Sequence, residues 1–282
     1  MISRKKRPSL GIALGGGLAL SVCHIGVLKA FEEAGLEISC VAGTSGGAVV
    51  GACYAAGVPL EQIAEAASQM RWRRMAGLRR PRLGFFSSET IAALVTSQIG
   101  EITFDELRIP FRAVAADLIT GEEMEIGHGN VGQAVRASCT IPAVFEPVSR
   151  DGRLLVDGGL VNKLPVDVVR RMGADVVIGS DVTYAARVGW NPRNVVDTIL
   201  ITLSFMGEAK TKTHRRMADF VICPEMVSAN ALSFTRWREA IEAGHKAASE
   251  VIPSIEEEIR RRSRWWSFAR ARRRKVVDEG KR

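Results

Sequence analysis

Short apolar runs alternate with segments of helical periodicity along residues 10–224. The apolar runs that predict strands are residues 10–14, 38–42, 110–117, 153–157, 175–182 and 219–224. Between the first two runs, apolar residues recur at helical spacing and predict a helix over residues 21–34. Further helices are predicted over residues 48–56, 164–172 and 194–208. Strands and helices that alternate in this way indicate an α/β fold with a mostly parallel sheet.

A Gly-x-Ser-x-Gly sequence stands where a predicted strand turns into a helix of small residues. It consists of Gly43, Thr44, Ser45, Gly46 and Gly47. A sharp strand-to-helix turn exposes the serine hydroxyl at the helix N-terminus, and the glycines allow neighbouring backbone to approach. Ser45 is therefore a candidate nucleophile for acyl transfer. The alternative is an ordinary turn that contains a serine, because this pattern also occurs by chance.

A glycine-rich loop connects the first predicted strand to the first predicted helix. Gly15, Gly16 and Gly17 offer backbone N–H groups that can bind a phosphate or stabilise an oxyanion. The dinucleotide-binding spacing is not met, because Leu20 occupies the position of its last glycine and no acidic residue ends a second strand. A nicotinamide cofactor is therefore not expected, and the loop is available to serve Ser45.

An aspartate ends the strand predicted over residues 153–157. Asp157 is followed by Gly158 and Gly159, which leave space around its carboxylate. Active sites in open α/β sheets assemble at the carboxyl ends of strands. An isolated Asp-Gly-Gly sequence is usually only a turn, but a serine nucleophile and an anion-binding loop require a base. Asp157 is the candidate for that base.

The composition is that of one globular domain in a reducing compartment. The 282 residues include 5 cysteines, which are scattered and form no Cys-x-x-Cys or Cys/His cluster, so neither a disulfide framework nor a zinc site is predicted. Residues 4–7 and the apolar run after them imitate an export signal, but consecutive glycines interrupt that run. No apolar run is long enough to predict a transmembrane helix. We expect a cytoplasmic protein.

Motifs in four regions, taken in order, resemble the patatin-like phospholipase family. They are residues 15–17 with His24–Leu28, residues 43–48, Arg136–Pro142 and Val156–Asn162. Their order extends the resemblance over roughly residues 9–250, and the combination is far more specific than any one motif. The resemblance implies a three-layer α/β/α fold with a mostly parallel central sheet. We therefore expect one acyl hydrolase domain over residues 9–259.

The resemblance also implies a mechanism. Ser45 is the implied nucleophile and Asp157 its base, in a Ser–Asp dyad that forms an acyl-enzyme. The implied oxyanion hole consists of backbone N–H groups, those of Gly15, Gly16, Gly17 and Gly46. No metal or other cofactor is needed. The expected function is hydrolysis of carboxylic ester bonds in lipids.

The chain departs from the family pattern in two places. Leu18, Leu20 and Ser21 stand where the family often has a glycine, a basic residue and a second glycine. Lys163 stands where the family often has a second asparagine after Asn162. Backbone N–H donors survive these changes, whereas a positive side chain at residue 20 and a glycine conformation at residue 18 are lost. The nucleophile and the base are unaffected.

Two other functions remain open from the sequence. A Ser–His–Asp esterase acting on soluble esters requires a late histidine, and His214 and His245 both meet that order. A non-catalytic lipid-binding or regulatory protein of the same fold would account for the changed loop at residues 18–21. His214 lies in a basic stretch that we expect to be solvated, and His245 in an amphipathic helix, so surface or packing roles are expected for both.

Several other segments are assigned to the scaffold. His24 is expected inside the first helix and His128 in a loop. Asp117 ends a predicted strand before Thr120 and Gly121, which favours an exposed turn over a place in the active site. Residues 61–99 are expected to form helices outside the core that cap the site.

Positive charge is concentrated at the ends of the chain. Residues 1–8 form a basic extension, and residues 260–282 contain 11 basic and 2 acidic residues, a net charge of +9 within a total of +8. This tail also contains Trp265, Trp266 and Phe268, and residues 71–86 mix arginines with aromatic residues in the same way. Such a mixture favours an anionic membrane surface over nucleic acid, since no nucleic-acid fold motif is present. We expect peripheral attachment to the inner face of the membrane through the tail, with a merely solvated tail as the alternative.

Overall fold

An eight-stranded sheet forms the centre of the fold, in the strand order β11-β10-β1-β2-β5-β9-β8, with β6 also paired to β5. The computed structural model describes residues 8–70, 77–78, 83–184, 198–199, 201–202, 207–226 and 234–279, and the side chains of the last helix as far as Arg264. The strands of this sheet are β1 (Leu10–Leu14), β2 (Ile38–Thr44), β5 (Phe111–Asp117), β6 (Glu123–Ile126), β8 (Val148–Arg150), β9 (Arg153–Asp157), β10 (Val176–Ser180) and β11 (Phe220–Ile222). The β5–β6, β5–β9 and β8–β9 pairs are antiparallel and the other pairs are parallel. The prediction of a mostly parallel sheet is confirmed.

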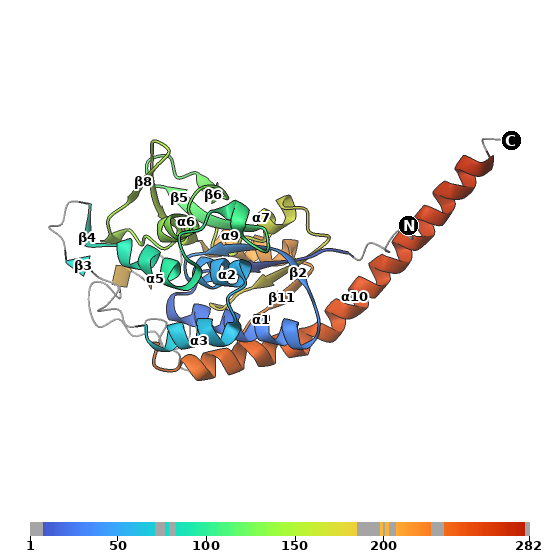
Figure 1. The fold of residues 1–282 in the computed structure, drawn as a ribbon, viewed down its shortest axis with the longest axis horizontal. Helices are drawn as coiled ribbons and strands as arrows, with labels where there is room; N and C mark the ends of the chain where they lie inside the picture. Colours follow the sequence, from blue (N-terminus) through green and yellow to red (C-terminus); the bar gives the residue numbers. More distant parts are fainter. Residues whose placement is uncertain are drawn as a thin grey trace.

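Helices cover both faces of the sheet and make a three-layer α/β/α structure (Figure 1). The described α-helices are α1 (Cys23–Glu33), α2 (Gly46–Ala56), α3 (Leu60–Ser68), α5 (Glu89–Ile99), α6 (Val131–Ser138), α7 (Val166–Arg171), α9 (Glu208–Met217) and α10 (Trp237–Glu279). Short 3-10 helices are η1 (Leu18–Val22), η2 (Phe104–Glu106) and η3 (Gly158–Leu160). A second, three-stranded sheet is formed by β3 (Gly77–Leu78), β4 (Gly84–Ser87) and β7 (Ala143–Phe145).

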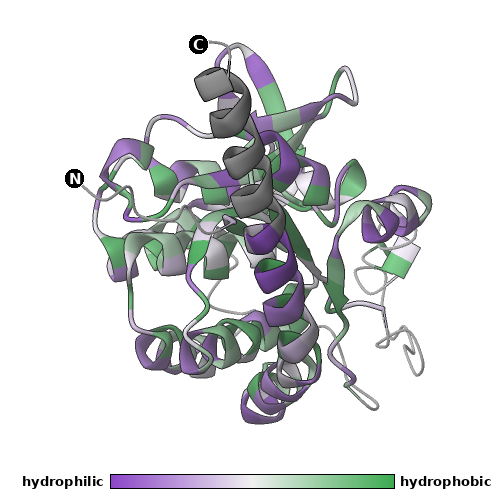
Figure 2. Ribbon diagram, turned by 90° about the vertical axis from the view of Figure 1, so that its right-hand side faces the viewer, coloured by the Kyte–Doolittle hydropathy of each residue, from purple (hydrophilic) through white to green (hydrophobic). Residues whose placement is uncertain are grey.

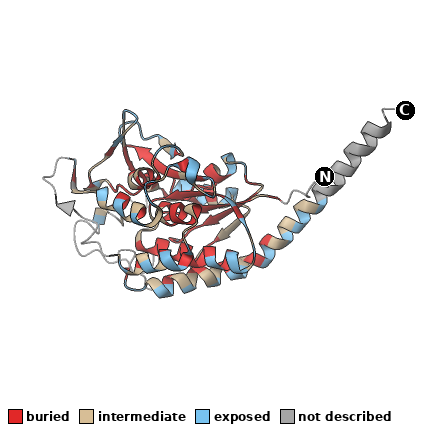
Figure 3. Cartoon of the chain, viewed as in Figure 1, coloured by how far each residue is buried: buried red, intermediate tan, exposed pale blue. Residues whose placement is uncertain are grey.

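The apolar residues divide into two cores, one on each face of the sheet. The larger core joins the sheet to α1, α2, α3, α5, α6 and α10, and the smaller joins it to α7. Figure 2 shows hydrophobic strands at the centre and hydrophilic residues on the outer helices, and Figure 3 shows buried residues concentrated in the sheet. This distribution is expected because burial of apolar surface is the main contribution to the stability of the packed layers.

The strands predicted over residues 10–14 and 153–157 are observed with the same bounds, and the other predicted strands differ only at their ends. The prediction that residues 210–216 are a solvated stretch is wrong, because they form part of helix α9, which packs on the body. Thr211 and His214 are buried three residues apart, so one face of this basic helix packs on the body while its other residues face solvent. Most of the helix predicted over residues 194–208 lies outside the described residues.

No helix within the described residues is both long and apolar enough to cross a membrane. Of the basic N-terminal extension, residues 1–7 lie outside these residues. So do residues 71–76 and 79–82, and the side chain of Phe85, from the segment that mixes arginines with aromatic residues. Residues 260–264, assigned to the tail, continue α10 without a break, and Arg262 forms ion pairs with Asp219 and Glu258. The first part of the predicted tail is therefore held against the body.

Helix α10 packs against α1 at a crossing with one glycine on each helix. A Cβ added at Gly26 would overlap the backbone carbonyl of Ile241, and one added at Gly244 would overlap that of Cys23. Backbone therefore contacts backbone at this crossing. Since α1 follows directly on the glycine-rich loop and η1, α10 supports the helix that anchors that loop.

Replacement of Gly244 by alanine tests this contact. At an exposed helix position the change would stabilise the fold by about 1 kcal/mol through helix propensity. Here the overlap with the Cys23 carbonyl opposes that gain, because overpacking costs about 1–3 kcal/mol. We expect Gly244→Ala to lower the free energy of unfolding by up to about 2 kcal/mol in urea denaturation, the cost of overpacking less the gain in helix propensity. Glu242→Ala, at an exposed position of α10, is the control, and a stabilised Gly244→Ala protein would contradict the close crossing.

Candidate active site

Ser45 occupies a one-residue turn between β2 and α2, with φ of 53° and ψ of −127°. A positive φ is strained for a residue with a side chain. The turn is tight because Gly43 and Gly47 contact backbone directly: a Cβ at Gly43 would lie 2.6 Å from Cα of Ala48, and one at Gly47 would overlap the Leu14 carbonyl. The glycines on either side of Ser45 are therefore required by the close approach of α2 to the sheet.

The sheet brings Asp157 to Ser45 from 112 residues away. Thr44 pairs with Val114 of β5, and the next residue of β5, Ala115, pairs with Asp157 at the end of β9. The Ser45 hydroxyl donates a hydrogen bond of 2.6 Å to Oδ2 of Asp157. The other carboxylate oxygen accepts the N–H of Gly159 at 2.7 Å. The two candidate residues thus share one buried hydrogen bond.

The surroundings of Asp157 make its carboxylate a stronger base than usual. Burial raises the pKa of Asp157 from 3.8 to about 6, although hydrogen bonds from Ser45 and Gly159 and the charge of Lys163 act in the opposite direction. Loss of hydration is thus the largest effect on this group. A carboxyl group with a pKa nearer to neutral accepts a proton more readily than an ordinary aspartate.

Helix α6 and the residues after it hold both members of the pair in place. The N–H of Ser45 donates to Oγ of Ser138 at 2.9 Å, and that hydroxyl donates to the Val114 carbonyl at 2.5 Å. The N–H of Asp157 donates to the Thr140 carbonyl at 2.8 Å. The Arg136–Pro142 motif can be recognised in the sequence, but these roles cannot, because the spacing of a motif does not reveal which distant backbone groups it contacts.

Two of the four N–H groups predicted to form the oxyanion hole are already hydrogen-bonded within the protein. The N–H of Gly15 donates to the Ser180 carbonyl at 3.0 Å, and that of Gly16 donates to the Lys163 carbonyl at 2.9 Å. These two donors hold the glycine-rich loop to β10 and to the segment before α7, and they are therefore not free to bind an oxyanion. Within the described part of the chain, the N–H groups of Gly17, Leu18 and Gly46 donate to no protein acceptor.

His24 fixes the same loop, a role that its expected place inside the first helix does not predict. Its Nε2 lies 2.8 Å from the Gly15 carbonyl and its Nδ1 lies 2.9 Å from Oγ of Ser180. A carbonyl only accepts, so Nε2 carries the proton and Nδ1 accepts from the Ser180 hydroxyl. Burial lowers the pKa of His24 to about 4. The ring is therefore neutral near pH 7 and tethers Gly15 without charge.

The residues that depart from the family pattern take distinct positions. Leu18 has a φ of 53°, the left-handed conformation that glycine adopts freely. Leu20 is buried in the larger core, so this position presents an apolar side chain. Ser21 is buried beside Gly46, and Lys163 is buried with its carbonyl bonded to Gly16.

The other three histidines lie away from this hydrogen-bonded pair. His214 is buried with Nδ1 2.8 Å from the Leu164 carbonyl, His245 pairs with Glu33 on the surface, and His128 pairs with Asp151. All histidines of the chain are among the described residues, and none is hydrogen-bonded to Ser45 or Asp157.

Asp117 forms the expected turn but is buried rather than exposed. Its carboxylate accepts the N–H groups of Ile119 at 2.9 Å and Thr120 at 3.4 Å. Arg153 of β9 donates to the other oxygen at 2.9 Å. The prediction of exposure was wrong because this arginine lies across the turn, and its charge compensates the buried carboxylate.

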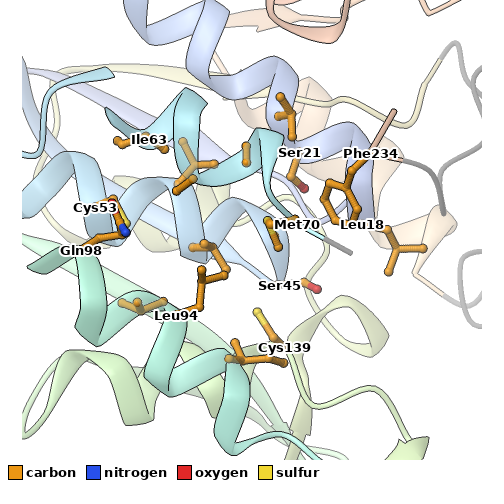
Figure 4. A pocket seen from close by; sticks show the side chains of 18 of the residues that line it. Leu18, Ser21, Ser45, Cys53, Ile63, Met70, Leu94, Gln98, Cys139 and Phe234 are labelled. Carbon is orange, nitrogen blue, oxygen red and sulfur yellow. The ribbon is translucent and has the colours of Figure 1, made fainter. Parts of the chain in front are cut away.

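An apolar cavity opens beside Ser45 between α1, α2, α3 and α5 (Figure 4). Its empty volume, including the open mouth, is about 850 Å³. In Figure 4, Ser45, Leu18 and Phe234 lie at one end, and Cys53 and Gln98 lie at the other. Helices α3 and α5, from the segment predicted to cap the site, contribute Ile63, Leu94 and Val95 to its wall.

Comparison with known proteins places this geometry in a family. A family model described as patatin-like phospholipase matches residues 12–170. An uncharacterized NTE family protein of Mycobacterium tuberculosis is 38% identical over 174 residues, 61% of this chain and 48% of the relative. Patatin-like phospholipase domain-containing protein 6 of Homo sapiens is 35% identical over 188 residues, 62% of this chain and 13% of the relative. Lysophospholipase NTE1 of Mycosarcoma maydis is 29% identical over 276 residues, which are 86% of this chain and 15% of the relative.

A solved structure shares the fold at low sequence identity. VipD from Legionella pneumophila matches with a TM-score of 0.52 and 12% identity, over 88% of this chain and 67% of that chain. The chain spans less than half the length of the curated relatives named above.

The burial of Asp157 predicts a pH-dependent effect of Asp157→Asn on stability. The pKa of Asp157 is about 6 in the folded protein and 3.8 in the unfolded chain. Between pH 3.8 and pH 6 the folded protein therefore holds a proton that the unfolded chain has lost, and the free energy of unfolding falls as the pH rises through this range. The cost is fully present above about pH 6 and absent below about pH 4, and amounts to roughly 3 kcal/mol. We expect the stability of Asp157→Asn relative to the parent to be higher at pH 8 than at pH 4, by up to this amount, in urea denaturation.

Asp105→Asn, an exposed position on η2, is the matched control and should behave alike at both pH values. A difference between parent and Asp157→Asn that does not change with pH would show that the Asp157 carboxylate is not destabilised by burial.

Proposed function

Because the chain belongs to the patatin-like phospholipase family, we propose that it is a serine acyl hydrolase that cleaves carboxylic ester bonds of lipids. One observation carries the proposal: the hydroxyl of Ser45, at a strained turn beside an apolar cavity, donates at 2.6 Å to a buried carboxylate. The relative from Mycosarcoma maydis that is named a lysophospholipase supports a lipid substrate.

The proposed reaction begins with attack of Ser45 on the ester carbonyl carbon. The Ser45 proton passes to Oδ2 of Asp157, and the carbonyl π electrons move onto the oxygen. Collapse of this intermediate re-forms the carbonyl and expels the alcohol, which takes the proton from Asp157. A water molecule then attacks the acyl-Ser45 carbonyl carbon while Asp157 takes its proton. Collapse breaks the bond to Ser45 Oγ, which regains its proton from Asp157, and the fatty acid is released. The pKa of about 6 leaves Asp157 mostly ionised at neutral pH and ready to accept a proton.

The charge on the carbonyl oxygen requires donors in a site that excludes water. We assign this role to the N–H groups of Gly17, Leu18 and Gly46, which donate to no acceptor among the described residues. Single donors of this kind contribute about 3–4 kcal/mol to transition-state stabilisation in acyl transfer. The Gly15 and Gly16 amides, bonded to the Ser180 and Lys163 carbonyls, act by holding this loop in position.

The cavity supports an acyl chain as the part of the substrate that is bound. Its wall is almost entirely apolar, and an acyl chain gains about 0.8 kcal/mol for each buried CH₂ group. With the ester carbonyl at Ser45, the chain would extend toward Cys53 and Gln98 (Figure 4). A Ser–His–Asp esterase is not favoured, since no histidine of the chain is hydrogen-bonded to Ser45 or Asp157.

A fluorophosphonate probe tests the nucleophile. The intact protein should be labelled at Ser45, identified by peptide mass spectrometry. Ser45→Ala should take up no label and should lose ester hydrolysis by about 10³-fold or more, because the attacking oxygen is gone. Ser39→Ala, an exposed serine on β2, is the control and should keep both properties. Full hydrolysis by a folded Ser45→Ala protein would end the assignment.

We further propose that the basic C-terminal segment attaches the protein to anionic membranes. Residues 265–282 contain 7 basic and 2 acidic residues together with Trp265, Trp266 and Phe268. Each cation near an anionic bilayer contributes about 1 kcal/mol before screening by salt, and aromatic rings favour the headgroup region. Arg262 is excluded from this role, because it is bound to Asp219 and Glu258.

Removal of residues 265–282 should abolish most binding to anionic vesicles while hydrolysis of a soluble short-chain ester is retained. The truncation point leaves the ion pairs of Arg262 intact. Co-sedimentation with anionic and neutral vesicles at low and moderate salt measures binding, which should be salt-sensitive. A full-length variant with Arg270, Arg272, Arg273 and Arg274 replaced by glutamine is the matched control and should resemble the truncation. Equal binding by intact and truncated protein would remove the tail from membrane attachment.

A further inference from the structure

Ser21 carries a buried hydroxyl with no hydrogen-bond partner beside the candidate nucleophile. The residue is 3% exposed, and its Oγ is unpaired among the described residues. Neighbouring buried hydroxyls are all engaged: Thr44 donates to the Asn162 carbonyl, Ser138 to the Val114 carbonyl, and Ser180 bonds His24. Buried polar groups nearly always have partners, so an unpaired one calls for an explanation.

The Ser21 hydroxyl lies close to Gly17 and Gly46, two of the residues whose N–H groups we assign to the oxyanion. Its Oγ is 3.5 Å from the position a Cβ would take on Gly17, and it occupies the space a Cβ would need on Gly46. Gly46 follows the nucleophile directly in sequence. Ser21 and Ser45 line the same cavity, and Figure 4 shows both near the end marked by Leu18 and Phe234.

We propose that Ser21 is a further catalytic residue, whose Oγ–H donates a hydrogen bond to the substrate carbonyl oxygen as charge develops on it. The proposal rests on the function proposed above. Rotation about χ1, the one side-chain torsion between Cα and Oγ, turns the hydroxyl from the wall toward a bound ester. The Ser21 hydroxyl forms no covalent bond to the substrate and keeps its proton, while the Ser45 proton goes to Asp157. On collapse of the intermediate the carbonyl re-forms and Ser21 is again unpaired.

The neighbouring positions explain why this chain would use a hydroxyl here. The resemblance to the family leads us to expect a basic residue at position 20 and a glycine at position 21. Leu20 is instead buried in the core, so no side-chain charge is present at that position. The absence of a Cβ on Gly46 provides the space into which the Ser21 side chain fits. A neutral donor thus lies next to the place where the oxyanion forms.

Two variants at this position separate hydrogen bonding from packing. Ser21→Ala removes the hydroxyl, and Ser21→Cys keeps the size of the side chain while replacing it with a weak donor. Both should lower kcat on a soluble short-chain ester by about 100-fold, as loss of one oxyanion donor does. KM and the melting temperature should stay near those of the parent. The rate at which a fluorophosphonate labels Ser45 should fall in parallel, because the phosphoryl oxygen takes the same position.

Ser39→Ala is the control for loss of a serine hydroxyl and should keep the parent kcat, since its Oγ donates to the Leu10 carbonyl outside the site. Parent-like kcat in Ser21→Ala would overturn the proposal, and so would a Ser21→Cys protein that recovers activity lost in Ser21→Ala. If Ser21→Ala fails to fold, Ser21→Gly replaces it, with the same expected loss. Absence of any labelling at Ser45 in the parent would instead overturn the proposed function.

Discussion

The site depends on direct backbone contact between the first turn of α2 and the two central strands. Gly43 lies against Ala48, and Gly47 lies against the carbonyl of Leu14, with no space for a side chain at either glycine. Because the chain must reverse direction between them, the strain is confined to Ser45. Strain of this kind persists only where the surrounding structure over-determines it. The position of the hydroxyl is therefore a property of β1, β2 and α2 together.

The same packing sets the basicity of Asp157. Its strand is antiparallel to β5, which places the carboxylate next to Ser45 inside the layer rather than at a solvated edge. Desolvation outweighs the hydrogen bonds and the charge of Lys163 that act on it, and the carboxylate is a stronger base as a result. A general base works best when its pKa is close to the pH of the reaction. In the proposed reaction, a buried aspartate alone fulfils the role that a histidine fulfils in a triad.

Sequence patterns predicted most strands and the two residues that share the hydrogen bond, because the turn glycines and the Asp-Gly-Gly sequence are local. They did not predict the hydrogen bonds of Ser138 and His24. Ser138 bonds to Ser45, 93 residues away, and His24 bonds to Ser180, 156 residues away. The oxyanion loop illustrates the limit most clearly. Three glycines in a row indicate free N–H groups. Only the folded structure shows that two of them are already bonded, Gly15 to the Ser180 carbonyl and Gly16 to the Lys163 carbonyl.

The departures at residues 18–21 form a consistent set in physical terms. Leu18 accepts a left-handed backbone and presents an apolar side chain to the cavity, and Leu20 adds to the core. A cation at residue 20 would have to be desolvated in the larger core, which is costly unless it is paired. Backbone N–H groups and a hydroxyl carry no net charge, so they avoid this cost. They still interact strongly with an oxyanion in a site of low dielectric constant. A loop without its usual cation is therefore compatible with acyl transfer, provided that its neutral donors are held in place, and the tether from His24 to Gly15 does this.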